Sequence, residues 1–203
     1  MLRRAACTIY LAQEADTLGK DSELASTLAQ GKPVIAFVPE VHANFAKELL
    51  AELRSVGIAG TEESLVLEQL QIFDPGAAWT DAQVREWASD PSLMTLADGL
   101  AKLQSTIQRH YDGRARTLKE THPLGVQVNL ATGVANGVLV VRTVNDCARL
   151  VRRIITRTLN FTIEETPVSI NLREEISGCI FRVVTADAML TNAFWNFYLD
   201  PSE

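Results

Sequence analysis

Glu23 is the side chain of this sequence with the clearest potential for chemistry. It lies in the stretch KDSELASTLAQGKPVIAFVPE, residues 20–40, in the first turn of a predicted helix that leads into an apolar strand. A first-turn acid is stabilised by the helix dipole, by about 0.3–1 kcal/mol, which gives Glu23 an ordinary structural interpretation. The other interpretation is a catalytic carboxylate. Asp21 and Ser22 directly precede it, one of them as the predicted N-cap and both as polar groups that could contact a substrate.

Three further residues are candidates for binding. Arg142 follows an apolar strand, and Arg149 begins a row with Arg153 and Arg157 at four-residue spacing on the next predicted helix. Guanidinium groups bind phosphates well, so we take Arg142 and Arg149 as candidate phosphate-binding residues. The alternative is a solvated helix face directed toward acidic parts of the same protein. His122, in the loop THPLG before a predicted strand, is a candidate substrate-binding residue, although single loop histidines are commonly plain surface residues.

The histidines and cysteines give no sign of a metal site. None of the three histidines has ligand spacing to another, and the three cysteines are widely separated with no CxxC pair; these are His42, His110 and His122, and Cys7, Cys147 and Cys179. Each cysteine has apolar neighbours, so we expect buried, reduced thiols. We expect neither a metal nor a cofactor.

The elements around the candidate carboxylate predict a parallel α/β arrangement. An apolar strand over residues 7–12 is followed by a helix over 22–30, a second strand over 33–39 and a second helix over 40–55. Gly31 follows the first helix at the C′ position, where positive φ is favoured. The second strand is continuously apolar, as strands buried on both faces tend to be. This order predicts a parallel sheet with right-handed crossovers.

This stretch resembles a motif of two related families, the Toll/interleukin-1-receptor-like (TIR) domains and the nucleoside 2-deoxyribosyltransferase-like proteins. In both, an acid early in a helix precedes GKPV and a hydrophobic strand; here the acid is Glu23 and GKPV is residues 31–34. The resemblance covers residues 8–41. It implies a Rossmann-like (flavodoxin-like) sheet and cleavage or transfer at an N-glycosidic bond of NAD or a nucleoside. A carboxylate can stabilise an oxocarbenium-like sugar or attack its anomeric carbon.

The resemblance has two further implications. Action on NAD would imply a role in signalling or defence. Both families also begin with an additional strand and helix, so we expect either a shortened N-terminus or a half-site supplied from elsewhere. The alternative function, from another class, is a nucleotide-sensing or protein-interaction module without catalysis.

The remainder of the chain divides into a helical and a mixed part. Residues 62–120 read as helices, interrupted at FDPGAAWT, where Thr80 is the predicted cap, and at SDPS. Afterwards VQVNL and GVLVVRT predict two strands around the loop ATGVANG. This loop could approach a phosphate through its backbone, or simply close a hairpin.

The end of the chain continues the mixed part. It predicts a helix over 144–159 with an inward apolar row, a strand over 178–185 and a final aromatic-rich helix. The inward row comprises Val144, Cys147, Ala148, Val151, Ile154 and Ile155. We predict residues 1–60 as a Rossmann-like segment, 61–121 as a helical insertion and 122–203 as a second α/β segment. The first and last segments are expected to pack as one body; a split near residue 60 or 122 is the alternative.

Composition restricts the partners. The 203 residues are 47% hydrophobic and 22% charged, with a net charge of −6. No run reaches the roughly 20 apolar residues needed to cross a bilayer, so we expect a cytoplasmic protein without a membrane partner. Residues 1–100 carry 7 basic and 15 acidic side chains, which argues against nucleic acid. A nucleotide or nucleoside is the expected small-molecule partner, and a homo-oligomer stays open.

Overall fold

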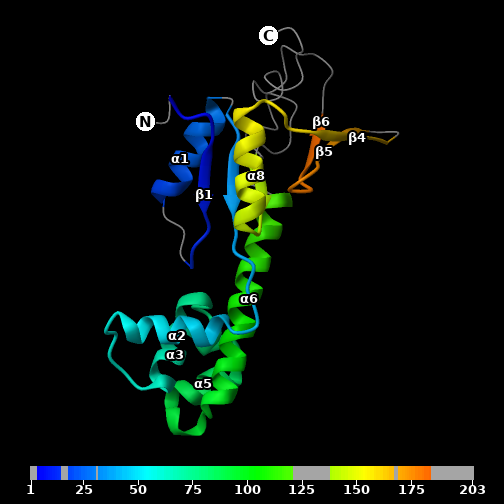
Figure 1. Ribbon diagram of the computed structural model, residues 1–203. Coiled ribbons are helices and arrows are strands. Elements are labelled where there is room, and N and C mark those ends of the chain that lie inside the picture. Colours follow the sequence, from blue (N-terminus) through cyan, green and yellow to red (C-terminus); the bar gives the residue numbers. More distant parts are fainter. Residues whose placement is uncertain (1–3, 15–17, 31, 121–137, 167–168, 184–203) are drawn as a thin grey trace. The chain divides into compact units, whose positions relative to one another are not determined.

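The computed structural model describes residues 4–14, 18–30, 32–120, 138–166 and 169–183. The chain forms two compact units (Figure 1): a sheet unit, residues 1–39 with 114–203, and a helical unit, residues 40–113. The first division thus falls at residue 39, whereas the sequence predicts one near residue 60. The strand predicted at VQVNL, the loop ATGVANG and the final aromatic-rich helix lie outside the described residues.

The sheet unit is mixed α/β, and its parallel sheet confirms that part of the prediction. Its elements are β1 (Thr8–Leu11), α1 (Leu18–Ala29), β2 (Val34–Phe37), β3 (Val138–Val141), α8 (Val144–Ile155), β4 (Phe161–Thr166), β5 (Ser169–Glu174) and β6 (Ile180–Val183). The first sheet has the order β1-β2-β3 with all strands parallel, so β2 is central. Its residues Val34, Ile35 and Ala36 are fully buried, which explains the continuous apolar run of this strand.

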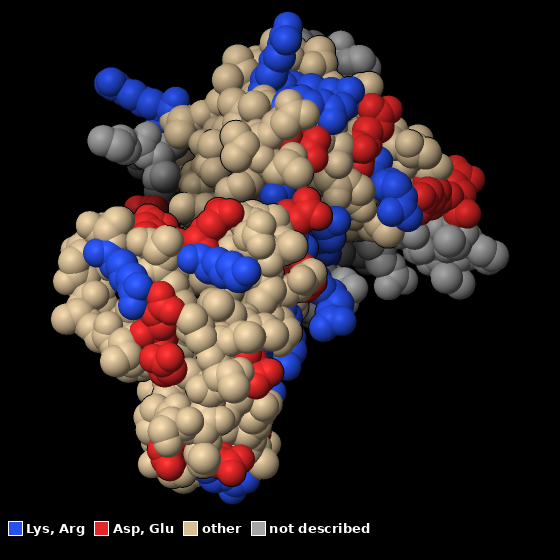
Figure 2. Space-filling view, turned by 60° about the horizontal axis from the view of Figure 1, so that its bottom comes forward, with Lys and Arg blue, Asp and Glu red and all other residues tan. Residues whose placement is uncertain are grey.

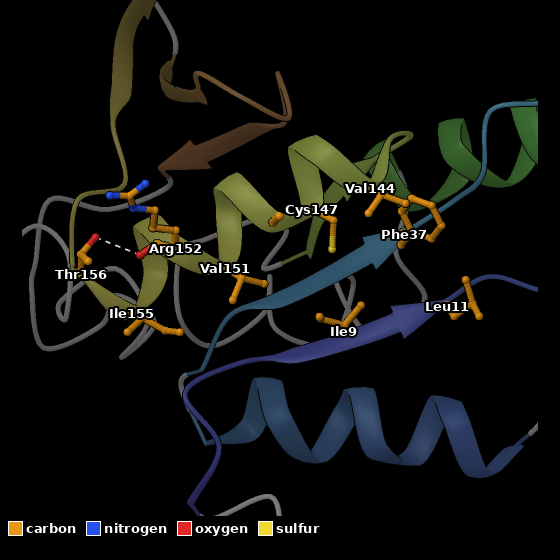
Figure 3. A pocket seen from close by; sticks show the side chains of 10 residues that line it. Ile9, Leu11, Phe37, Val144, Cys147, Val151, Arg152, Ile155 and Thr156 are labelled. Atoms are coloured by element: carbon orange, nitrogen blue, oxygen red, sulfur yellow. Dashed lines mark hydrogen bonds between the residues drawn. The ribbon is translucent and has the colours of Figure 1, made fainter.

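Strand alternation directs β1 toward two different helices. The Thr8 hydroxyl is 2.8 Å from the hydroxyl of Thr27 on α1, which places Thr8 and, two residues on, Tyr10 on the α1 face. Ile9 and Leu11 therefore lie on the opposite face, where they line a groove with residues of α8. Figures 1 and 3 both show the strands between α1 and α8. The first sheet is accordingly the middle of three layers.

The predicted start of α1 is wrong. The helix begins at Leu18, so Asp21 and Ser22 lie inside it and neither is the N-cap. Glu23 is consequently in the second turn, not the first. An Asp-Ser pair favours a cap because such side chains compete for backbone groups, but the Ser22 side chain is exposed to solvent, which lets the helix continue through it.

The second sheet is an antiparallel meander in the order β4-β5-β6. In the turn between β5 and β6, the Glu174 carboxylate accepts hydrogen bonds from the backbone amides of Ile176 and Ser177, at 3.0 and 2.6 Å. Cys179 joins the turn to the first sheet. Its sulfur accepts a hydrogen bond from the backbone amide of Val140 on β3 at 3.2 Å. Lys119 also donates to the Ser177 carbonyl oxygen at 3.0 Å.

The helical unit is built from helices, as the sequence predicts, and three of those described begin at a capping side chain. Its elements are α2 (Phe45–Ser55), α3 (Glu62–Phe73), α4 (Ala77–Thr80), α5 (Ala82–Ser89), the 3-10 helix η2 (Pro91–Leu93) and most of α6 (Leu96–Glu120). Asp81, not the predicted Thr80, caps α5 by accepting the amides of Gln83 and Val84 at 3.1 and 3.2 Å. Asp90 precedes Pro91 at the predicted second break and accepts the amide of Ser92.

The surface of the helical unit carries charges of both signs. Basic and acidic side chains are interspersed over the face shown in Figure 2, and several form ion pairs, among them Arg54 with Glu62 at 2.7 Å. This face therefore presents no continuous basic surface for nucleic acid. Within the described part of the whole chain, no helix is long and apolar enough to cross a membrane.

Candidate functional site

Glu23 lies on the exposed side of α1. Its backbone carbonyl oxygen accepts a hydrogen bond from the Thr27 hydroxyl at 2.9 Å, and that hydroxyl meets Thr8 of β1 at 2.8 Å. These contacts hold the middle of α1 against the start of β1. The Glu23 carboxylate has neither an ion pair nor a hydrogen bond within the described residues, and it is open to solvent.

The other predicted substrate contacts are only partly placed. Ser22 is exposed on α1 next to Glu23, and Asp21 is in the same helix turn, although its side chain lies outside what the structure describes. His122 also lies outside the described residues. The structure therefore brings Asp21, Ser22 and Glu23 together on one helix and leaves the role of His122 a prediction.

The two predicted phosphate-binding arginines have partners within the sheet unit. Arg142 donates to the carbonyl oxygens of Val38 and Pro39, at 2.9 and 3.0 Å, and so joins the carboxyl ends of β3 and β2. Arg149 forms an exposed ion pair with Asp146, one helix turn earlier, at 3.0 Å. The binding of phosphate by either residue stays a prediction.

The sheet unit also has an apolar groove that the sequence does not reveal. It has a volume of about 670 Å³ and lies between two strands and α8 (Figure 3). Its lining comes from β1, β2, α8 and the residue after α8: Ile9, Leu11, Phe37, Val144, Cys147, Ala148, Val151, Arg152, Ile155 and Thr156. The groove lies on the face of the sheet opposite α1, so Glu23 does not belong to it.

The groove exposes side chains that the sequence assigns to the interior. Ile9 and Leu11 are 53% and 46% exposed, and Val144 and Ile155 at the two ends of α8 are 73% and 65% exposed. The prediction that Val144 and Ile155 face inward is wrong, because the sheet under α8 ends at β1 and does not reach them. The helical spacing of the apolar row on α8 was visible in the sequence. Nothing in the sequence indicated, however, that β1 is an edge strand.

Among the described residues, the same strand also has a backbone edge without a hydrogen-bond partner. The amides of Thr8 and Ala12 donate to Pro33 and Phe37 beside them, at 3.2 and 3.0 Å. Because successive residues of a strand direct their amides to opposite sides, the amide and carbonyl groups of Ile9 and Leu11 point away from β2. Among the described residues these outward groups have no hydrogen-bond partner.

The charged and titratable groups of the groove are few. Arg152 lies at one end of it, exposed, and its guanidinium has no ion pair within the described part of the chain. Burial raises the pKa of the Cys147 thiol, and burial together with nearby Cys147 raises the pKa of Cys7. All three cysteines are free, but the prediction that each is buried holds only for Cys179, because Cys7 and Cys147 are half-buried. No group of three metal-ligating side chains occurs among the described residues.

Comparison of this chain with protein-family models, with characterised proteins and with solved structures finds no match. The interpretation of the site therefore depends on the geometry of the described residues and on the resemblance of residues 8–41 to the two families named above.

Proposed function

We propose that this chain is a protein-interaction module that binds an extended partner segment along β1. One observation carries the proposal: in the part of the chain that the structure describes, the backbone edge without a partner and the exposed apolar side chains of Ile9 and Leu11 belong to the same strand, β1. An exposed apolar edge strand is a template for pairing with another chain. Addition of a strand to such an edge is a recurrent mode of peptide recognition.

The groove supplies the side-chain half of this recognition. A strand added beside β1 would direct alternate side chains toward the α8 face, where Val151 and Ile155 offer apolar contacts. Each apolar side chain transferred from water contributes about 25 cal/mol per Å² of buried area. Arg152 at the end of the groove would favour a segment with an acidic residue at that end.

A random-peptide display library tests the proposal directly. The wild-type protein is expected to enrich peptides with alternating apolar residues. Ile9→Pro removes the outward amide without breaking a bond to β2, and Ile155→Glu places a charge in the groove. Each should weaken binding of the enriched peptides about tenfold or more, which corresponds to 1.4 kcal/mol.

The matched control is Ile163→Glu, which changes an isoleucine of the second sheet that is similarly exposed, at 63%. This variant should bind the same peptides as the wild type. The proposal would be contradicted if the wild type enriched no peptide. It would also be contradicted if Ile9→Pro and Ile155→Glu bound the enriched peptides as tightly as the wild type does. Circular dichroism of each variant establishes that it is folded.

We propose, as a second candidate, cleavage of an N-glycosidic bond in NAD or a nucleoside, with Glu23 as the carboxylate. The observation that favours it is the exposure of the Glu23 carboxylate, without a neutralising partner among the described residues, on the helix after β1. The parallel sheet, which a Rossmann-like fold would also have, and the resemblance of residues 8–41 to TIR-like proteins support this hypothesis. Signalling or defence would be the corresponding role.

Release of free base separates the two candidates. The protein is incubated with NAD and with deoxynucleosides, as wild type, as Glu23→Gln, and as Glu68→Gln, an exposed acid of the helical unit. The second candidate expects base release that Glu23→Gln abolishes and Glu68→Gln preserves. Release that survives Glu23→Gln would remove the role given to that carboxylate.

A further inference from the structure

A groove lies between α2 and α6 of the helical unit, a unit that the structure describes at every residue. The groove has a larger chamber of about 410 Å³ and a smaller one of about 260 Å³. Lys47 and Leu100 line both chambers, which are therefore neighbouring parts of one groove. The volume of the larger chamber is within the range usual for small-molecule sites.

Small side chains keep this groove open. Gln104 of α6 fastens the start of α2, because its side chain accepts the amide of Ala46 at 2.9 Å and donates to the His42 carbonyl oxygen at 2.7 Å. Beyond this point the exposed alanines Ala51 on α2 and Ala97 on α6 line the groove. Their short side chains leave space between the two helices that larger residues would fill.

The larger chamber has apolar walls. Leu50 is buried, at 5% exposure, whereas Leu96 and Leu100 are only half-buried and keep apolar surface in contact with water. Arg54 and Glu62 also line this chamber, and they form an ion pair with each other at 2.7 Å. The charges of this pair therefore compensate each other.

Lys47 is a cation without a partner in an acidic unit. Residues 40–113 carry 12 acidic and 5 basic side chains, and three of the basic ones form ion pairs, namely Arg54, Lys102 and Arg109. The Lys47 ammonium has neither an ion pair nor a hydrogen bond among the described residues. No acid is three or four residues from it on α2; these positions are Ala43, Asn44, Leu50 and Ala51.

We propose that this groove binds a medium-chain alkyl carboxylate, with the carboxylate at Lys47 and the chain in the larger chamber. The ammonium complements a single negative charge, and the many carboxylates of the unit disfavour a ligand with several. Burial of the alkyl chain against Leu50, Leu96 and Leu100 supplies the apolar contribution. From Lys47 to Arg54 the helix rises about 10 Å, which restricts the chain to medium length.

Isothermal titration calorimetry with sodium octanoate tests the head-group contact. The wild type is expected to bind one octanoate. Lys47→Met keeps an apolar stem but removes the charge, so it should weaken octanoate binding tenfold or more and leave the binding of neutral 1-octanol unchanged. The matched control is Arg85→Met, which removes the other basic side chain of the unit without an ion pair and should bind octanoate as the wild type does.

Filling the larger chamber tests the contact with the alkyl chain. Ala51→Leu adds bulk inside the chamber and should abolish the binding of both octanoate and 1-octanol. Ala88→Leu makes the same change at an exposed position of α5 and should preserve both. Because both alanines are exposed, neither change overpacks the core, and circular dichroism establishes that each variant is folded.

Three outcomes would overturn the proposal. The first is a wild type that does not bind octanoate, and the second is a Lys47→Met variant that binds octanoate as tightly as the wild type. The third is a greater loss of octanoate binding in Ile155→Glu than in Ala51→Leu, because the ligand would then lie in the groove beside β1. The two grooves belong to different units, so each of these outcomes leaves peptide binding along β1 to its own test.

Discussion

The guanidinium of Arg142 donates from Nε to the carbonyl oxygen of Val38 at 2.9 Å, across the ends of two neighbouring parallel strands. A second nitrogen of the same group donates to the Pro39 carbonyl oxygen at 3.0 Å. One side chain thus fastens the carboxyl edge of the first sheet. Phosphate binding by Arg142 would require these bonds to be shared or exchanged.

Removal of this guanidinium should destabilise the protein. Arg142→Ala loses hydrogen bonds from a charged donor, each worth about 1.5–3 kcal/mol. We therefore expect the free energy of unfolding to fall by at least this amount, and the urea midpoint to fall with it. Arg149→Ala breaks only an exposed ion pair and should change stability by about 0–1 kcal/mol. Equal urea midpoints for the two variants would contradict the fastening role.

Two glycines of α6 should respond oppositely to alanine. A Cβ at Gly99 would lie 2.7 Å from the sulfur of Met94 and 3.2 Å from a methyl group of Val66, both buried side chains. We therefore expect Gly99→Ala to cost about 1–3 kcal/mol through overpacking. A Cβ at Gly113 meets nothing within 4 Å, so Gly113→Ala should stabilise the helix by about 0.5–1 kcal/mol. Thermal unfolding of both variants decides whether the signs differ.

Acid should weaken the helical unit partly through Asp81. Its hydrogen bond to Lys102, with the amides it caps, lowers the pKa of this carboxyl in the folded protein. The stabilisation is present above the unfolded pKa, about 3.9, and is lost as pH falls through the lower folded pKa. Asp81→Asn keeps a capping oxygen but cannot titrate. Urea unfolding of this variant between neutral and acid pH should therefore show a smaller loss of stability than the wild type; an equal loss would contradict this role.

Alkaline pH should destabilise the folded protein through the buried thiol of Cys179. Burial raises its pKa, so the folded state retains the proton after the unfolded state has released it. Stability is complete below the ordinary cysteine pKa of about 8.5 and declines as pH rises above it. Cys179 should also react with a thiol reagent more slowly than Cys7 and Cys147, which are only half-buried. Mass spectrometry of partly labelled protein identifies the order, and rapid native labelling of Cys179 would refute the assignment.

Local signals predicted much of the fold. The apolar run at Val34, the proline at Pro91 and the amphipathic pattern from Val144 each located an element correctly, because capping and periodicity act within a few residues. The start of α1 escaped prediction because Asp21 and Ser22 suit a cap and an exposed helix position equally well. The local sequence is therefore compatible with a helix that starts at these residues and with one that continues through them, and contacts with the rest of the chain favour the second.

The groove could not be predicted because it depends on strand order. Ile9 and Leu11 read as buried residues, and they would be buried if another strand lay beside β1. The partners of Arg142 are likewise more than a hundred residues away in the sequence. Periodicity identifies which face of an element is apolar, but only the assembled sheet shows which apolar face remains uncovered.

The contact between Cys179 and Val140 makes the two sides of the first sheet unlike. On β3 the outward amide of Val140 donates to the cysteine sulfur, whereas on β1 the corresponding groups have no partner within the described ranges of the chain. If both edge strands of a sheet can pair with another copy, copies can add without limit into a ribbon. If only one edge strand can pair, association through the sheet stops when two copies have paired. The small turn that carries Cys179 would therefore make association through this sheet self-limiting, and its loss would favour fibres over a finite complex.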